Sequence, residues 1–213
     1  MKVKLMADIT VGDIKKITKG KLLCGNEYDI CENFCIDSRE IKSGDVFVGI
    51  KGERVNGNEL YEEVLKKGAK CLILENVEIP EDIIKKFTDS AIIIVEDTIK
   101  ALQQIAEYKR NLYKIPVIAI TGSVGKTSTK DIVAEVVSKK YKVLKTQGNL
   151  NNHIGLPLTI LSLKDEEAMV VELGMSHLGE ISTLTKIAKP TIAIITNVGT
   201  AHIGKKDYKT MEH

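Results

Sequence analysis

The chain has 213 residues, a formal net charge of +2, and 43% hydrophobic against 28% charged residues. This composition is ordinary for a globular protein with one large or two smaller domains, and the small net charge gives no reason to expect a nucleic-acid or membrane partner. No apolar run approaches the roughly 18 residues of a membrane span, and the N-terminus is charged too early for a signal peptide, so we expect a cytoplasmic protein.

Residues 1–97 mix short strands, turns and helices. Gly68 closes a helical pattern, because glycine is favoured just after the last turn of a helix. Short continuous apolar runs are typical of buried strands. The expected elements are strands at 46–50, 71–74 and 91–95, a turn at 42–45 and a helix at 59–67.

A helix is predicted over residues 98–112. Leu102, Ile105 and Ala106 recur at helical spacing, and Asp97 is placed to cap the first turn. We take this helix as the junction of two domains. The sequence therefore predicts an N-terminal mixed α/β domain over 1–112 and a second domain over 113–213.

The four cysteines follow no zinc-ligand spacing and have no histidine among them. We expect buried or half-buried free thiols rather than a metal site or a structural disulfide. A reducing compartment, which the phosphate-binding segment described next implies, agrees with that expectation. The cysteines are Cys24, Cys31, Cys35 and Cys71.

A phosphate-binding loop is predicted at residues 121–128, which read Thr-Gly-Ser-Val-Gly-Lys-Thr-Ser. An apolar run precedes it and a stretch of helical spacing follows it, which is the strand–turn–helix context that such a loop requires. Ile120 stands where the general pattern has its first glycine, so an ordinary strand-to-helix turn is the alternative. The helical stretch is marked by Ile132, Val133, Val136 and Val137.

The residue types of this loop suit a triphosphate. Gly122 and Gly125 allow the backbone to bend so that its N–H groups converge, and the following helix start adds partial positive charge. Lys126 can reach terminal phosphates, and the Thr127 hydroxyl can ligate Mg²⁺. The candidate nucleotide-binding residues are Gly122, Ser123, Val124, Gly125, Lys126, Thr127 and Ser128.

From residue 116 onward, strands and helices alternate. Alternation at this spacing predicts a parallel sheet covered on both faces. In such a sheet, ligands gather beyond the carboxyl ends of the strands. We expect strands at 117–121, 142–146, 168–172 and 191–196, and helices at 126–139, 153–162 and 178–188.

Unusual polar residues follow these strand ends. Asn151 and Asn152 could donate to phosphate or to a developing oxyanion, although an asparagine-rich run is also typical of a turn. Glu172 closes an apolar strand and should meet a cation such as Mg²⁺, with a salt bridge or a helix N-cap as the alternatives. His202 is a candidate metal ligand or phosphate contact, or an ordinary polar residue.

Together these motifs resemble those of the Mur ligases, the ATP-dependent amide ligases of bacterial cell-wall precursor synthesis. The loop at 121–128 is similar to the family's phosphate loop, which accounts for the missing first glycine. Segments 37–48 and 51–57 resemble the part that holds the uridine nucleotide, with Ser38 as the residue that contacts UDP. The run at 149–159 resembles the members that add D-alanyl-D-alanine, whereas members that add the third residue carry a Thr-Thr-Pro segment nearby.

The resemblance implies that ATP phosphorylates the free carboxylate of UDP-N-acetylmuramoyl-tripeptide and that the amine of D-alanyl-D-alanine then attacks the acyl phosphate. Lys126 and the loop backbone would neutralise the γ-phosphoryl group. Thr127 and Glu172 would hold one Mg²⁺ and His202 would help to hold a second, while Asn151 or Asn152 would orient the phosphate or the intermediate. The catalytic candidates are Lys126, Asn151, Asn152 and His202, and the metal-ligand candidates are Thr127, Glu172 and His202.

The resemblance also implies a UDP-precursor-binding first domain and an incomplete P-loop ATP-binding domain after it. A carbamylated lysine of the family would lie a little past His202 and is absent from this sequence, as is the third domain that receives D-alanyl-D-alanine. We therefore expect a truncated, monomeric chain that does not complete the ligation. The alternatives are a Mur ligase that adds the third residue and a P-loop nucleotide-binding module outside the ligases.

Overall fold

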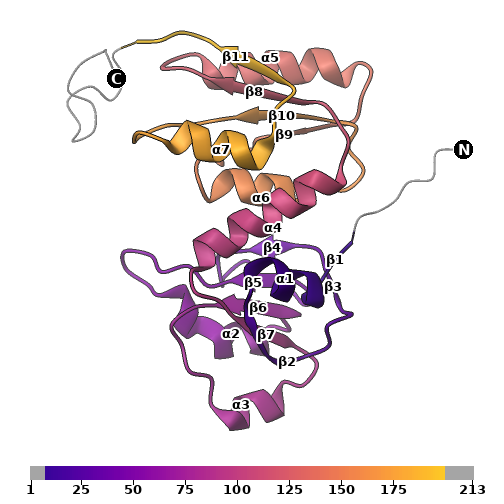
Figure 1. The fold of residues 1–213 in the computed structure, drawn as a ribbon, viewed down its shortest axis with the longest axis vertical. Coiled ribbons are helices and arrows are strands. Elements are labelled where there is room, and N and C mark those ends of the chain that lie inside the picture. Colours follow the sequence, from indigo (N-terminus) through magenta and orange to yellow (C-terminus); the bar gives the residue numbers. More distant parts are fainter. Residues whose placement is uncertain (1–7, 200–213) are drawn as a thin grey trace, which may run out of the picture. The chain divides into compact units, whose positions relative to one another are not determined.

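A computed structural model describes residues 8–199. The chain divides into two compact units, Met1–Lys109 and Arg110–His213, and the division lies within helix α4 (Thr98–Leu112) (Figure 1). This is the helix that the sequence predicts as the junction, although the division comes before its end at Leu112. No helix within residues 8–199 is long and apolar enough to cross a membrane.

The first unit contains a five-stranded mixed sheet. Its strands are β2 (Lys21–Cys24), β4 (Phe34–Cys35), β5 (Val46–Val48), β6 (Cys71–Leu74) and β7 (Ala91–Ile94), in the order β2-β7-β6-β5-β4. β4 to β7 run parallel, and β2 is antiparallel to β7. A separate antiparallel pair is formed by β1 (Ile9–Thr10) and β3 (Ile30–Cys31). The helices are α1 (Val11–Thr18), the 3₁₀ helix η1 (Gly57–Leu60), α2 (Tyr61–Lys66), α3 (Glu81–Lys86) and most of α4.

Local signals explain much of this unit. β6 is apolar and fully buried, which confirms the strand predicted at 71–74. Gly68 adopts a φ of +86° after α2, where a side chain would be strained. At the start of α4, the Lys100 N–H donates to Oδ1 of Asp97 at 2.8 Å, as expected of a cap. The helix predicted at 59–67 is present, but its first turn is the 3₁₀ helix η1, which Asn56 caps.

The second unit contains a four-stranded parallel sheet. Its strands are β8 (Val117–Thr121), β9 (Val143–Lys145), β10 (Ala168–Glu172) and β11 (Ile192–Ile195), in the order β11-β8-β10-β9. The helices between them are α5 (Lys126–Ser138), α6 (Gly155–Leu161) and α7 (Glu180–Ala188). Helix α5 covers one face of the sheet, and α6 and α7 lie together on the other (Figure 1). The predicted parallel sheet with two covered faces is confirmed.

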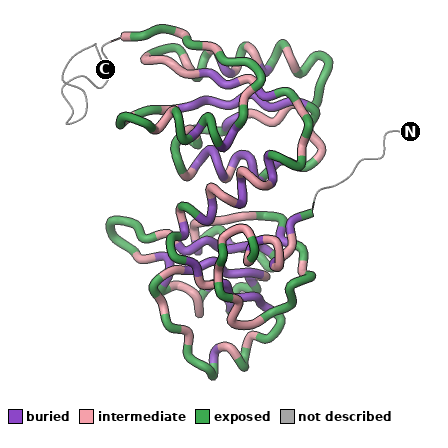
Figure 2. Tube along the Cα trace, viewed as in Figure 1, coloured by how far each residue is buried: buried purple, intermediate pink, exposed green. Residues whose placement is uncertain are grey.

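Burial differs along this unit (Figure 2). β10 is buried over its whole length, whereas the edge strand β11 is largely exposed, with Ile195 65% exposed. The apolar face predicted for α5 is partly wrong, because Ile132 and Val136 are each 66% exposed. The sheet packs against the side of α5 that carries Lys130 and Ala134, both of which are buried. A lysine therefore lies within the sheet-facing side of this helix.

All four cysteines are free thiols. Cys31 and Cys71 are buried, and Cys24 and Cys35 are half-buried. Burial raises the pKa of the Cys24 and Cys35 thiols, and a contact with the Cys31 thiol, together with burial, raises the pKa of Cys71. These thiols are poor nucleophiles at neutral pH, because the reactive form of a thiol is the thiolate.

Candidate functional site

The parallel register brings the carboxyl ends of the strands of the second unit to one edge. Glu172, the last residue of β10, pairs with Ile120 of β8, and Ile195, the last residue of β11, pairs with Thr121. β9 runs in the same direction beside β10. The loops that follow these strands therefore share one rim, as the sequence predicts.

The loop between β8 and α5 turns sharply. Gly122 has a φ of +137° and Gly125 a φ of +81°, conformations that favour glycine. A Cβ on Gly122 would lie 2.1 Å from Oγ1 of Thr196, so no side chain fits there. Because α5 begins at Lys126, the backbone N–H groups of its first turn have no acceptor within the helix. Those amides and the positive end of the helix dipole suit an anion.

The Lys126 side chain lies across this loop. Its ammonium Nζ donates to the carbonyl oxygen of Gly122 at 2.7 Å and to that of Ser123 at 3.3 Å. Both acceptors are neutral. A phosphate oxygen would be a stronger acceptor, since charge-assisted hydrogen bonds are about twice as strong as neutral ones. A phosphate bound at this loop could therefore replace the two carbonyls as the partner of the ammonium group.

Glu172 is buried at this rim, with 3% of its surface exposed. The Thr127 hydroxyl donates to its Oε2 at 2.8 Å, and the Asn151 amide Nδ2 donates to its Oε1 at 2.8 Å. In the part of the chain that the structure describes, these side-chain partners are neutral. A carboxylate in this setting favours a cation, and the carboxylate and hydroxyl oxygens are the kind of ligand that Mg²⁺ takes. The residues present thus fit a magnesium ion.

Two buried hydrogen bonds link the backbone of Glu172 to Thr146 and Thr146 to Lys130. The N–H of Glu172 donates to Oγ1 of Thr146 at 3.0 Å, and Nζ of Lys130 donates to the Thr146 carbonyl oxygen at 3.0 Å. Thr146 is fully buried and Lys130 is 4% exposed. The Asp131 carboxylate lies 3.4 Å from the Lys130 ammonium. Sequence reasoning missed Thr146 and Lys130, although a lysine one helical turn beyond Thr127 was an available signal.

The two candidate asparagines lie in different surroundings. The Asn151 side chain donates to Glu172, and the Asn151 backbone carbonyl oxygen accepts the N–H of Gly174 at 2.8 Å. Asn152 Oδ1 instead accepts the N–H groups of Ile154 at 3.0 Å and Gly155 at 2.8 Å, at the start of α6. Asn152 therefore caps a helix, and Asn151 is the asparagine that the fold brings to the carboxylate.

The segment after β11 also reaches the phosphate loop. Asn197 Oδ1 accepts the N–H groups of Ser123 at 3.1 Å and Val124 at 3.0 Å. Sequence reasoning singled out this segment for His202 and missed Asn197. His202 itself lies outside the described residues, so its role as a metal ligand stays a prediction.

Ser38, the candidate UDP contact, lies in the first unit and is held by its own neighbours. It is 8% exposed, and its carbonyl oxygen accepts a hydrogen bond from Lys67 Nζ at 2.8 Å. The Lys67 ammonium, and more weakly the Ser38 hydroxyl, lower the pKa of the Glu63 carboxyl. The contact of Ser38 with UDP stays a prediction.

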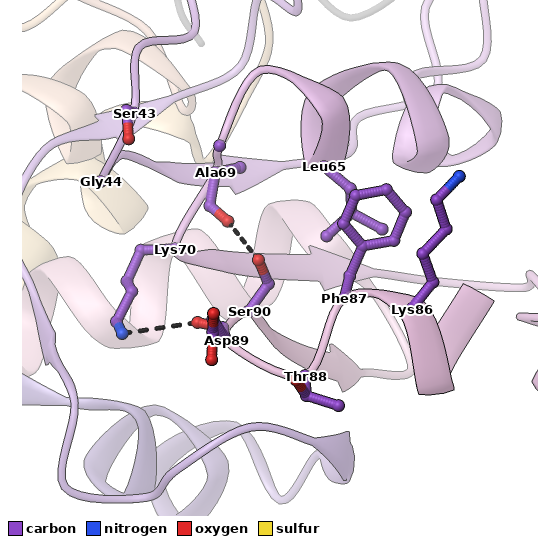
Figure 3. A pocket seen from close by; sticks show the side chains of 11 residues that line it. Ser43, Gly44, Leu65, Ala69, Lys70, Lys86, Phe87, Thr88, Asp89 and Ser90 are labelled. Carbon is purple, nitrogen blue, oxygen red and sulfur yellow. Dashed lines mark hydrogen bonds between the residues drawn. The ribbon is translucent and has the colours of Figure 1, made fainter. Parts of the chain in front are cut away.

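A pocket of about 380 Å³ opens in the first unit at the amino ends of β6 and β7 (Figure 3). Two of its polar side chains, Lys70 and Ser90, have partners nearby. Lys70 Nζ reaches the Asp89 carbonyl oxygen at 3.4 Å and the Asp29 carboxylate at 2.8 Å, and the Ser90 hydroxyl donates to the Ala69 carbonyl oxygen at 2.7 Å. The residues Ser43, Gly44, Lys86 and Phe87 also line it. Ser38 is not among its lining residues, so the pocket does not correspond to the predicted UDP contact.

Comparison with known families covers most of the chain. Residues 32–110 match the Mur ligase family, catalytic domain, and residues 120–213 match the Mur ligase middle domain. The second match contains the phosphate loop, Asn151 and Glu172.

Individual relatives point the same way. The UDP-N-acetylmuramoyl-tripeptide–D-alanyl-D-alanine ligase of Synechocystis sp. is 44% identical over 174 residues, which is 81% of this chain and 37% of the relative. A crystal structure of MurF from Acinetobacter baumannii superposes with a TM-score of 0.80 at 35% identity, over 93% of this chain and 43% of that one. The MurF ligase of Thermotoga maritima, solved in complex with ADP, has a TM-score of 0.72 at 39% identity over 80% of this chain and 38% of its own. This chain thus spans less than half the length of the relatives it matches.

Proposed function

The chain belongs to the Mur ligase family, and from this premise we propose that it serves the ATP-dependent ligation of UDP-N-acetylmuramoyl-tripeptide to D-alanyl-D-alanine. Relatives named UDP-N-acetylmuramoyl-tripeptide–D-alanyl-D-alanine ligase are 34% to 44% identical to the chain. The reaction makes a peptide precursor of the bacterial cell wall. We place it in the cytoplasm, with which the four free cysteines are consistent.

One observation carries the proposal. The hydroxyl of Thr127, directly after the loop lysine, lies 2.8 Å from the buried carboxylate of Glu172, which comes from a different strand. The first-turn amides of α5 and the Lys126 ammonium lie beside this pair on the same rim. The groups that would bind a triphosphate and those that would bind a divalent ion are therefore adjacent, as phosphoryl transfer from ATP requires.

The residues of this chain would act on ATP in the first step. The first-turn amides of α5 would donate to phosphate oxygens, and Lys126 would transfer its hydrogen bonds from the loop carbonyls to the γ-phosphoryl oxygens. Thr127 and Glu172 would hold Mg²⁺, with Asn151 keeping the carboxylate oriented through its bond to Oε1. When bound, Mg²⁺ supplies positive charge that offsets the repulsion between the attacking carboxylate and the triphosphate.

The covalent steps then follow from the chemistry of the substrates. An oxygen of the tripeptide carboxylate attacks the γ-phosphorus, the bond to the β-phosphate oxygen breaks, and ADP leaves. The amine of D-alanyl-D-alanine attacks the carbonyl carbon of the acyl phosphate and loses a proton, and phosphate leaves as the amide forms. Ser38 would contact the UDP group and His202 would help to hold a second Mg²⁺, as the resemblance implies.

Calorimetric titration of the chain with two ligands tests the proposal. We expect binding of ATP in the presence of Mg²⁺, and separate binding of UDP-N-acetylmuramoyl-tripeptide. If the chain binds ATP but does not bind the UDP precursor, the result would favour a P-loop module outside the ligases. Binding of neither ligand would contradict the proposal.

A further inference from the structure

The phosphate loop is held from outside by the segment that follows β11. Two N–H groups of the loop, from Ser123 and Val124, donate to the single side-chain oxygen Oδ1 of Asn197 at 3.1 Å and 3.0 Å. The carbonyl oxygen of Asn197 accepts a longer bond from the Ser123 N–H at 3.3 Å. One exposed asparagine thus satisfies both amides at the tip of the turn.

Neighbours of Asn197 extend this contact. The Thr196 hydroxyl donates to the Val124 carbonyl oxygen at 2.6 Å, and the Gly199 N–H donates to Oγ of Ser123 at 2.9 Å. Gly122 leaves the space that Thr196 occupies, because a Cβ there would be 2.1 Å from its Oγ1. Residues 196–199 are called the loop clamp below. Its fit to the loop involves both side chains and backbone.

The clamp separates the amides of the loop into two sets. The N–H groups of Ser123 and Val124 are directed to Asn197, whereas those of Lys126, Thr127 and Ser128 at the start of α5 have no acceptor within the helix. An anion would therefore be received by the second set and by the Lys126 ammonium. The first set fixes the turn, so the loop does not have to be ordered when a ligand binds.

We infer that Asn197 is a positioning residue of the phosphate loop, which presets the turn so that the α5 amides and Lys126 converge on a triphosphate. This inference rests on the proposed ATP-dependent function. In this role Asn197 acts on the substrate through the loop, because its side-chain oxygen binds two loop amides. It also makes the conformation of the loop depend on the end of β11.

The test uses the 213-residue chain and inorganic tripolyphosphate with Mg²⁺, a ligand that isolates the phosphate contacts from those of the nucleoside. Asn197→Leu removes the acceptor at similar size, and Asn197→Asp keeps an acceptor oxygen. Thr196→Val removes the hydroxyl, and Thr196→Ser retains it. Thr185→Val is the matched control, because the exposed Thr185 hydroxyl donates to the Ile181 carbonyl oxygen at 2.7 Å on α7.

Two measurements are made at a temperature where thermal melts show every variant to be folded. Without ligand, hydrogen exchange of the Ser123 and Val124 amides should be slow in the wild type and in Asn197→Asp, and about 10-fold faster in Asn197→Leu. The affinity for tripolyphosphate should fall about 10-fold in Asn197→Leu and about 5-fold in Thr196→Val, and stay within about 2-fold of wild type in Thr196→Ser and Thr185→Val.

Three results would overturn the inference. Fast exchange of both amides in the wild type would show that the clamp does not form in solution. Unchanged affinity in a folded Asn197→Leu variant would show a contact without influence on the ligand, and tighter binding would show that Asn197 obstructs the loop. If the wild type binds neither tripolyphosphate nor ATP, the proposed function fails together with the inference. If the wild type binds ATP and the Asn197 and Thr196 variants bind it equally well, only the inference fails.

Discussion

The phosphate loop of the second unit and the Ser38 segment of the first are both candidate substrate contacts, but they are held differently. The loop is contacted from other strand ends, by Glu172 at the end of β10 and by Asn197 after β11. Ser38 is held by Lys67, which directly follows helix α2 and donates to the Ser38 carbonyl oxygen. Contacts between strand ends gather the groups of a binding site, whereas the bond from Lys67 fastens the turn at Ser38 to the end of α2. The difference predicts that changes at the two places affect different ligands.

The largest effect is expected for Lys126→Met. Loss of the ammonium should weaken ATP binding about 100-fold, because it removes a charge-assisted contact to the terminal phosphates. Binding of the UDP precursor and thermal stability should not change, since Lys126 contacts only loop carbonyls. Calorimetry with both ligands measures this. The control is Lys139→Met, which removes an exposed lysine near the end of the same helix. If Lys126→Met lost affinity for ATP and for the UDP precursor equally, the two regions would not bind different ligands as predicted.

A smaller and more specific effect is expected for Glu172→Gln. The amide cannot replace the charge of the carboxylate, so the gain in ATP affinity from adding Mg²⁺ should shrink about 10- to 30-fold. ATP affinity in excess chelator should change much less. Paired titrations with Mg²⁺ and with EDTA measure the difference, with the exposed Glu135→Gln as control. A Mg²⁺ dependence that is the same as in the wild type would remove Glu172 from the metal site.

Lys130→Met should act on stability. Its ammonium is buried and donates to Thr146, so its loss leaves a buried carbonyl without its charged donor and should lower the free energy of unfolding by about 1–3 kcal/mol. The neighbouring Asp131 retains Lys145, whose Nζ lies 2.7 Å from its carboxylate. Thermal melting and urea unfolding measure the change. If the Lys130→Met variant matched the wild type in stability and in ATP binding, the hydrogen bonds that link Lys130, Thr146 and Glu172 would have no energetic role.

The smallest effect concerns Asp37, beside Ser38. The Arg39 guanidinium lowers the pKa of the Asp37 carboxyl from its ordinary 3.8 to about 2. Because the pKa is lower in the folded state, the stabilisation is present above about pH 4 and is lost as the pH falls toward 2. The Arg39 side chain is 85% exposed, so solvent screens the pair and the change in stability should be slight. An NMR titration should show the pKa of Asp37 returning toward 3.8 in Arg39→Gln and not in Arg54→Gln. No difference between these variants would show that Arg39 does not control this carboxyl.

Sequence patterns predicted the second unit well because three of its four strands, β8, β10 and β11, are apolar runs followed directly by polar residues. The rule that ligands gather at the carboxyl ends of strands then predicts that the loop and Glu172 share one rim. The first unit was less predictable, since β1, β3 and β4 have two residues each and no period. The antiparallel β2 gave no signal either.

Side-chain partners could not be read from the sequence in either unit. Asn151 and Asn152 are adjacent and chemically identical, and only the path of the loop decides that one meets Glu172 and the other caps α6. Asn197 meets the phosphate loop because β11 lies beside β8, and strand order is not written in local patterns. Lys130 was missed because a lysine on a helix is expected to be solvated, whereas the rotation of α5 against the sheet buries it.

The measurement that most directly tests the central arrangement replaces Mg²⁺ by paramagnetic Mn²⁺ and follows the backbone amide signals of the chain by NMR. With ATP present, the signals of Thr127 and Glu172 should broaden first and most strongly, and this should be lost in Glu172→Gln. Broadening centred elsewhere on the chain, or broadening of these two amides that does not depend on ATP, would contradict a metal ion held between this carboxylate, this hydroxyl and a triphosphate.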